Sequence, residues 1–160
     1  MSTHFFDSLD VTRFLTPKIF YVGASFGDNE CQLDRFIKGG FWENGFFKSN
    51  HVSTVTKNYE NYIDLVAKGD IFVVKRLNGK ASSTMRILAI GIVLGKNFDR
   101  TIRVAWVMQN IDLTITLTTV GTISHGYWLS EILDESLLNM ITKARTKFLR
   151  LNLKIEDRYY

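Results

Sequence analysis

The sequence predicts an α+β domain in which a small antiparallel β-barrel is flanked by helices. Apolar side chains recur at steps of three and four residues in segments 29–38, 52–66 and 130–151, which is the spacing of a buried helical face. Residues 71–117 instead hold β-rich runs separated by short turns, a pattern typical of an antiparallel meander. Meanders of this size often curl into a barrel, because closure removes their exposed edges.

The bulk properties predict one domain over residues 1–160, with residues 150–160 as a tail or truncation point. A content of 46% hydrophobic and 22% charged residues is ordinary for a soluble globular protein. No apolar run approaches the roughly 20 residues that span a bilayer, and the first residues lack a secretory signal, so we expect no membrane contact and a cytoplasmic location. The lone Cys31 excludes an internal disulfide and a cysteine-based zinc cluster, and we expect no cofactor.

The N-terminal third alternates short regular segments with turns. Thr16-Pro17 closes a helical turn, and residues 18–23 read as a strand. Asp28 is expected to cap a helix over residues 29–38, with Cys31 on its apolar side as a buried structural thiol. Gly39 is expected to end that helix in the C-cap position.

Residues 39–47 contain four large aromatic side chains interrupted by three glycines and one asparagine, which fits neither a helix nor a strand. We interpret this segment as a shaped loop. Aromatic residues on such a loop either close the end of a core or form a flat-walled pocket in which a planar ligand stacks. Both interpretations remain open at this stage.

The second half supplies the sheet and a last helix. We expect a helix over residues 52–66 and strands over 71–75, 85–94, 102–107 and 111–117, with a bulge at Gly91 and a turn at 97–100. The last helix begins near Ser130. Its predicted buried face consists of Leu133, Leu137, Ile141, Phe148 and Leu151.

A net charge of +4 and a pI of about 9.2 favour a polyanionic partner, and the positive excess lies in residues 81–160. One basic group follows a stripe of the last helix, and another flanks the turn at Asn78-Gly79. Each is either a solvated surface or a set of phosphate contacts. The candidate phosphate contacts are Lys143, Lys147 and Arg150 on the helix, with Lys154 beyond them, and Lys75, Arg76, Lys80 and Arg86 around the turn.

No catalytic constellation is visible in the sequence. His4, His51 and His125 are isolated, without the spacing of metal ligands. Residues 91–97 have the wrong spacing for a phosphate loop, and no pair of carboxylates suggests acid–base chemistry. We therefore expect a recognition module and not an enzyme.

Several short motifs resemble the recognition domains at the N-terminus of McrB-like AAA+ GTPases, which belong to modification-dependent restriction systems. The similar segments are residues 20–27, Phe36, residues 40–46, residues 68–70, residues 86–93 and residues 104–106. The order of elements is also similar to that of EVE and YTH domains of the PUA-like superfamily. Together the motifs cover most of residues 19–130.

The resemblance implies a PUA-like barrel that binds DNA carrying a modified base, flipped into an aromatic cage. It also implies an AAA+ GTPase domain and a nuclease subunit as partners. Stacking on aromatic walls contributes about 1–3 kcal/mol per base. The pocket residues that it nominates are Trp42, Asn44, Phe41, Ser25, Trp106 and Trp128.

Two other functions are compatible with the same sequence. A PUA-like barrel can hold an unstacked RNA base, which would make the chain an RNA-binding module. Alternatively, the aromatic residues are core residues and the chain is a regulatory domain whose partner is a protein.

Overall fold

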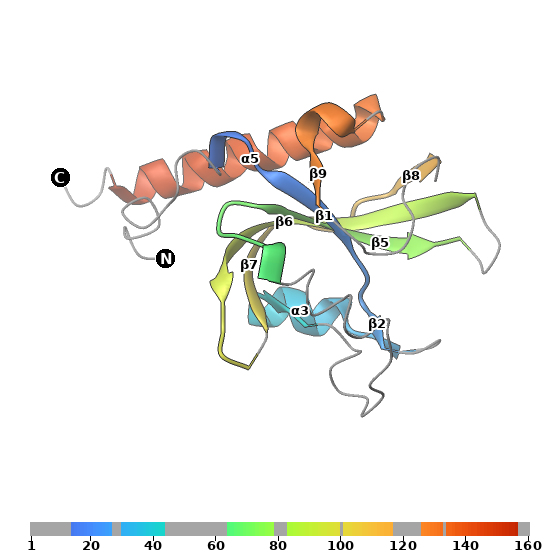
Figure 1. The fold of residues 1–160 in the computed structure, drawn as a ribbon, viewed down its shortest axis with the longest axis horizontal. Coiled ribbons are helices and arrows are strands. Elements are labelled where there is room, and N and C mark those ends of the chain that lie inside the picture. The colour runs from blue at the N-terminus through green and yellow to red at the C-terminus, as the bar shows by residue number, and fades with distance from the viewer. Residues whose placement is uncertain are drawn as a thin grey trace.

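The computed structural model describes residues 14–26, 30–43, 64–78, 83–99, 101–116, 126–132 and 134–156. Their fold is α+β: a curled, mixed β-sheet forms a half-barrel, and helices α3 (Leu33–Gly39) and α5 (Glu135–Glu156) pack on it (Figure 1). The strands are β1 (Lys18–Val22), β2 (Ser25–Phe26), β3 (Glu30–Cys31), β4 (Phe41–Trp42), β5 (Ile71–Leu77), β6 (Thr84–Lys96), β7 (Ile102–Met108), β8 (Leu113–Thr116) and β9 (Tyr127–Trp128), and a 3-10 turn, η2, spans Leu129–Glu131.

The main sheet has the order β4-β7-β6-β5-β1-β9, and β8 pairs with the first part of β6. The antiparallel pairing predicted for residues 71–117 is confirmed for β5 with β6 and for β6 with β7. The expectation of an all-antiparallel sheet is wrong, because β1 pairs with β5 in parallel, with Ile19 opposite Ile71. Parallel neighbours require a crossover connection, and the long segment between β1 and β5, which includes α3, provides it.

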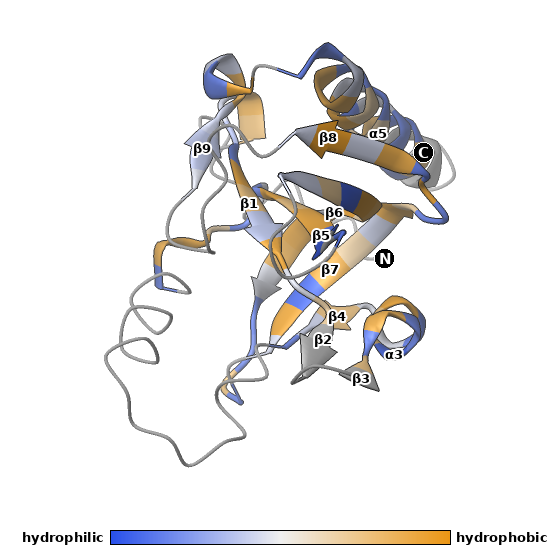
Figure 2. Cartoon of the chain, turned by 90° about the vertical axis from the view of Figure 1, so that its right-hand side faces the viewer, coloured by the Kyte–Doolittle hydropathy of each residue, from blue (hydrophilic) through white to orange (hydrophobic). Residues whose placement is uncertain are grey.

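Strand alternation divides the core between the two faces of the sheet. On β5, Ile71 and Val73 belong to the cluster that packs against α5, whereas Phe72 and Val74 belong to the cluster that packs against α3. Figure 2 shows the apolar residues on the strands between the two helices. Helix α5 therefore covers the centre of one face of the sheet, and α3 covers part of the other face.

Asp70 connects three segments inside this core. Its side chain is fully buried, and its two carboxylate oxygens accept hydrogen bonds from the backbone N–H groups of Lys18 (3.0 Å) and Ala67 (2.8 Å). Its carbonyl oxygen accepts from the Val93 N–H at 2.8 Å. A buried carboxylate is tolerated when its oxygens are satisfied in this way, so Asp70 fixes the start of β1 and of β5 against β6.

Three expectations about the segment before the aromatic residues are corrected: the place of Cys31, the start of the helix and the position of its C-cap. Cys31 lies in β3 opposite Ser25, and its side chain is exposed, so it is not a buried thiol on a helix. The helix starts at Leu33 because β2 and β3 pair, and the Gln32 N–H donates to the Ala24 carbonyl at 2.6 Å. It extends through Gly39, and Gly40, with φ of 66°, is the left-handed cap.

The last helix begins five residues later than predicted, after η2. Of its predicted buried face, Leu137, Ile141 and Phe148 are buried, whereas Leu133 precedes the helix and lies outside the described residues. Leu151 is 52% exposed, which contradicts its predicted burial. The buried stripe continues from Phe148 to Asn152, which is the next position at a step of four. The Asn152 side chain is satisfied by donating to the Phe148 carbonyl at 2.8 Å. No helix of the described part of the chain is long and apolar enough to cross a bilayer.

The bulge predicted at Gly91 is confirmed by a register shift between Ile90 and Gly91 in the pairing of β6 with β7. The position has no room for a side chain. A Cβ atom there would lie 2.3 Å from Val104 Cγ1 and 2.8 Å from Trp106 Cε3. The Trp106 ring therefore lies directly over the glycine, and the bulge determines where this indole sits.

We expect Gly91→Ala to lower the free energy of unfolding by about 1–3 kcal/mol, because Val104 and Trp106 must both move to admit the methyl group. Chemical denaturation measures this loss. Gly23→Ala is the matched control, since a Cβ at Gly23 would meet no atom within 4 Å. Equal stability of the two variants would show that the Trp106 ring is free to leave Gly91.

Candidate nucleic-acid interface

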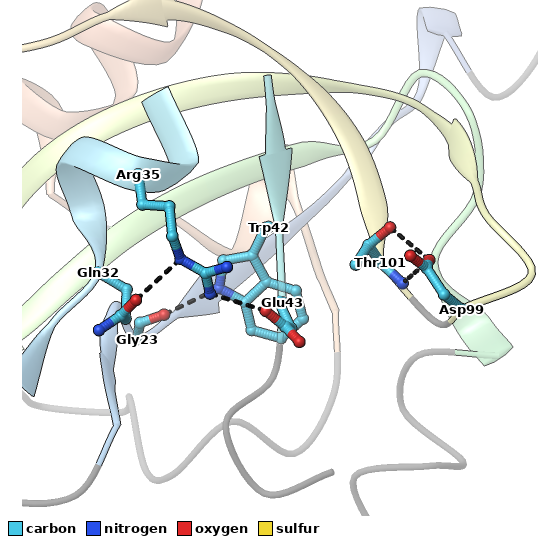
Figure 3. A network of polar contacts seen from close by, with 7 residues as sticks. All are labelled: Gly23, Gln32, Arg35, Trp42, Glu43, Asp99 and Thr101. Carbon is cyan, nitrogen blue, oxygen red and sulfur yellow. Dashed lines mark hydrogen bonds and ion pairs between the residues drawn. The ribbon is translucent and has the colours of Figure 1, made fainter. Parts of the chain in front are cut away.

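The indole of Trp42, the residue that the resemblance nominates first for a pocket, lies inside the core. Its exposure is 1%, its ring packs edge-on against Phe72 with centroids 5.3 Å apart, and its Nε1 donates to the Gly23 carbonyl at 2.8 Å (Figure 3). Pairing of Trp42 with Ile102 across β4 and β7 directs this side chain inward. The expectation that Trp42 forms an open pocket wall is therefore corrected: the residue is a core anchor.

Phe41 and Trp106 are half-buried beside α3. The Trp106 Nε1 donates to the carbonyls of Phe36 (3.0 Å) and Phe41 (3.3 Å), which holds the indole against the end of the helix. Arg35 lies over the Phe41 ring at 5.2 Å and forms an ion pair with Glu43 at 2.8 Å. These contacts hold the Phe41 and Trp106 rings beside α3, with the Arg35 guanidinium next to Phe41. Figure 3 shows the ion pair of Arg35 with Glu43.

Trp128 is the most exposed tryptophan, at 43%. It lies on β9 directly opposite Lys18 of β1, and the Lys18 Nζ sits 4.9 Å from the centre of the indole. The backbone N–H of Trp128 donates to Glu131 Oε2 at 2.6 Å. A cation against an accessible indole can hold a stacked base and a neighbouring phosphate together, and sequence inspection did not connect Lys18 with this site.

The three indoles do not line one slot. Trp42 is sealed in the core, and between Trp106 on β7 and Trp128 on β9 lie three strands, β6, β5 and β1. Neighbouring strands are about 4.8 Å apart, so along the sheet the two tryptophans are roughly 19 Å from each other. Ser25 lies in β2 opposite Cys31. Asn44 and Lys80 lie outside the described residues.

The cations predicted around the β5–β6 turn lie on different faces. Arg76 and Arg86 are exposed and directly opposite each other across β5 and β6, on the side of the sheet away from α5. Asp112 lies 3.7 Å from Arg86. Lys75 points toward the α5 side and is half-buried, and this burial lowers the pKa of its ammonium group. Lys75, Arg76 and Arg86 therefore do not form one continuous surface that could bind a phosphate backbone.

The stripe of Lys143, Lys147 and Arg150 on α5, in contrast, lies on one side of the helix and is exposed. A hollow of about 590 Å³ runs along the outer side of the helix. Among the described residues it is lined by Thr142, Lys143, Thr146, Lys147, Arg150 and Leu151. The hydroxyls of Thr142 and Thr146 donate to the carbonyls one turn earlier, at 3.0 Å each, so their oxygens are available as acceptors only.

Between its terminal residues Glu135 and Glu156, α5 carries charge of one sign. Residues 136–155 include five Lys and Arg and no Asp or Glu. Two of these cations donate hydrogen bonds to backbone carbonyls of core residues. The Lys147 Nζ donates to the Val107 carbonyl at 3.1 Å, and Arg145 donates to the Phe14 carbonyl at 2.9 Å. The cations that line the outer hollow are therefore Lys143, Lys147 and Arg150, whereas Arg145 bonds inward.

The described residues contain no group of three or more His, Cys, Asp or Glu side chains that could hold a metal ion. Comparisons with protein-family models, curated proteins and solved structures found no match to this chain.

Proposed function

We propose that this chain is a non-catalytic DNA-binding domain that recognises a modified base. One observation carries the proposal: the hollow along α5 bears Lys143, Lys147 and Arg150, with no acidic residue between positions 136 and 155. A surface helix normally mixes charges of both signs, because like charges at neighbouring positions repel. A one-sided stripe favours a ligand that brings its own regularly spaced negative charges, and the phosphate backbone of a nucleic acid is such a ligand.

Phosphate contacts position a protein on a duplex but do not distinguish one base from another. The base-reading part of the proposal is supported by the resemblance to McrB-like recognition domains and by the accessible aromatic side chains. With Trp42 in the core, the indole that can stack on an extruded base is Trp128, backed by Lys18. Phe41 and Trp106, half-buried beside Arg35, form a second aromatic surface.

In this proposal the chain supplies recognition alone. GTP hydrolysis and strand cleavage would belong to an AAA+ GTPase domain and a nuclease subunit. The PUA-like assignment is part of the same proposal. The curled half-barrel with helices on its faces is compatible with a small β-barrel of that type.

A panel of otherwise identical duplexes tests the function. We expect binding to all of them at low salt, with an affinity that falls steeply as salt rises, and tighter binding to one among methylcytosine, hydroxymethylcytosine and methyladenine. Equal affinity for every duplex would reject modified-base recognition but keep DNA binding. No binding at low salt would reject both and favour a protein partner.

A competition experiment distinguishes DNA binding from the alternative, which is RNA binding. Single-stranded RNA and duplex DNA that carry the same modified base are titrated against a labelled duplex. We expect the duplex to compete more strongly, because the α5 stripe extends over several helical turns and matches a regular phosphate backbone. Stronger competition by the RNA would replace the proposal with an RNA-binding module.

A further inference from the structure

The hairpin between β6 and β7 ends in a phenyl ring that is completely outside the fold. Phe98 has a relative exposure of 111%, the highest of the large hydrophobic side chains in the described residues. A single exposed hydrophobic residue is common on protein surfaces and needs no explanation by itself. What distinguishes Phe98 is the hydrogen-bonded turn below it and the charge of the strands on either side.

Hydrogen bonds join Asn97 and Thr101 on either side of the turn, and Phe98 lies between them at the tip. The Asn97 N–H donates to the Thr101 carbonyl at 2.9 Å, and the Asn97 side-chain amide donates to Thr101 Oγ1 at 2.9 Å. Thr101 in turn donates to Asp99 Oδ1 from its hydroxyl (2.6 Å) and its backbone (3.0 Å), as Figure 3 shows. These bonds also lower the pKa of the Asp99 carboxyl. The ring therefore projects from a turn whose described residues are joined by hydrogen bonds.

Basic side chains lie near the stem of this hairpin, which is formed by the end of β6 and the start of β7. Arg103 and Lys96 are exposed on β7 and β6, and the Arg103 guanidinium lies over Gly95, where a Cβ would approach its Nη2 to 2.6 Å. Lys68 joins them, because the Gly69 N–H donates to the Val93 carbonyl and brings the 68–70 turn to the same stem. Burial, followed by the nearby Arg103, lowers the pKa of Lys68. Among the described residues, the acidic side chains near this hairpin include Asp99, which accepts from Thr101, and Asp64, whose backbone carbonyl accepts from the Lys96 Nζ at 3.3 Å.

An apolar ring at the tip of a hydrogen-bonded turn, with cations on the strands behind it, fits the way in which proteins insert side chains between the base steps of DNA. The ring enters the stack, and the cations contact the phosphates beside the insertion. Strand β7 connects this hairpin to the α5 stripe. From Ile102, at the start of β7, to Val107, whose carbonyl binds Lys147, is five residues or roughly 17 Å, a length of about five base pairs.

We propose that Phe98 is a wedge that inserts into the base stack of bound DNA, where it opens a base step, while Lys68, Lys96 and Arg103 hold the flanking phosphates. The inference rests on the proposed DNA-binding function and adds an element to it. An opened step lowers the work of extruding the neighbouring base, so the wedge and the base-reading aromatics would act on the same event.

The test compares wild type, Phe98→Ala and Phe98→Leu on a short duplex in which 2-aminopurine flanks a methylated cytosine. Wild type should raise the 2-aminopurine fluorescence on binding, because the probe loses stacking. Phe98→Ala should abolish the rise and weaken binding by about 5- to 100-fold, and Phe98→Leu should retain part of both. Leu15→Ala, at a position 65% exposed, is the control and should match wild type.

The outcomes separate the wedge from the function on which it rests. If wild type binds the duplex and Phe98→Ala binds with the same affinity and the same fluorescence rise, the wedge is rejected and DNA binding stands. If wild type does not bind the duplex at low salt, both the proposed DNA-binding function and the proposed role of Phe98 are rejected. If Phe98→Ala loses binding to vesicles of anionic lipid but not to DNA, the hairpin is a membrane contact and the wedge is overturned.

Discussion

Trp42→Ala is expected to lower the free energy of unfolding by about 3–5 kcal/mol, the usual range for removing a fully buried large aromatic side chain. The indole is 1% exposed and packs on Phe72, so its loss leaves a cavity in the cluster below α3. The loss also breaks the hydrogen bond to the Gly23 carbonyl, which ties β4 to the end of β1. We therefore expect a defect in folding, and not a selective defect in base discrimination.

Chemical denaturation followed by circular dichroism measures the effect, and Trp42→Phe is the informative partner. It keeps an aromatic ring in the core but lacks the N–H donor, so its loss should be smaller, about 1–3 kcal/mol. The opposite pattern is a stable Trp42→Ala variant that binds modified and unmodified duplexes equally. That result would return Trp42 to the role of pocket wall and refute its assignment to the core.

Replacing Lys143 and Lys147 together with glutamine is expected to weaken binding to every duplex, modified or not. It should also reduce the slope of log K against log salt by about two, because each phosphate contact contributes roughly 0.9 to that slope. Both side chains line the hollow on α5 and are exposed, so the fold does not depend on their burial. Fluorescence anisotropy at several salt concentrations measures affinity and slope together.

Lys147 also bonds to the Val107 carbonyl, so Lys143→Gln alone and Arg150→Gln alone serve as variants that leave this contact intact. Each should reduce the slope by about one. The double variant Arg76→Gln/Arg86→Gln is the matched control from the far face of the sheet. If it lowers the slope while the α5 variants do not, DNA binds the opposite face and the α5 assignment is wrong.

The local pattern of the sequence was sufficient for the regular elements of the second half. Strands β5, β6 and β7, the bulge at Gly91 and the exposed basic stripe of α5 all follow from periodicity within short segments. Helical steps of three and four place Lys143, Lys147 and Arg150 on one side, whatever the helix packs against. These features depend only on neighbours along the chain.

The tertiary structure decided which aromatic residues are accessible. Periodicity cannot tell a core tryptophan from a ligand-binding one, because both interpretations need a large ring on a short segment. Pairing of β4 with β7 buried Trp42, and pairing of β9 with β1 exposed Trp128 and set Lys18 against it. The parallel pairing of β1 with β5 is of the same kind. Each results from contacts between segments far apart in the sequence, whose geometry is set by packing and not by the residues next to them.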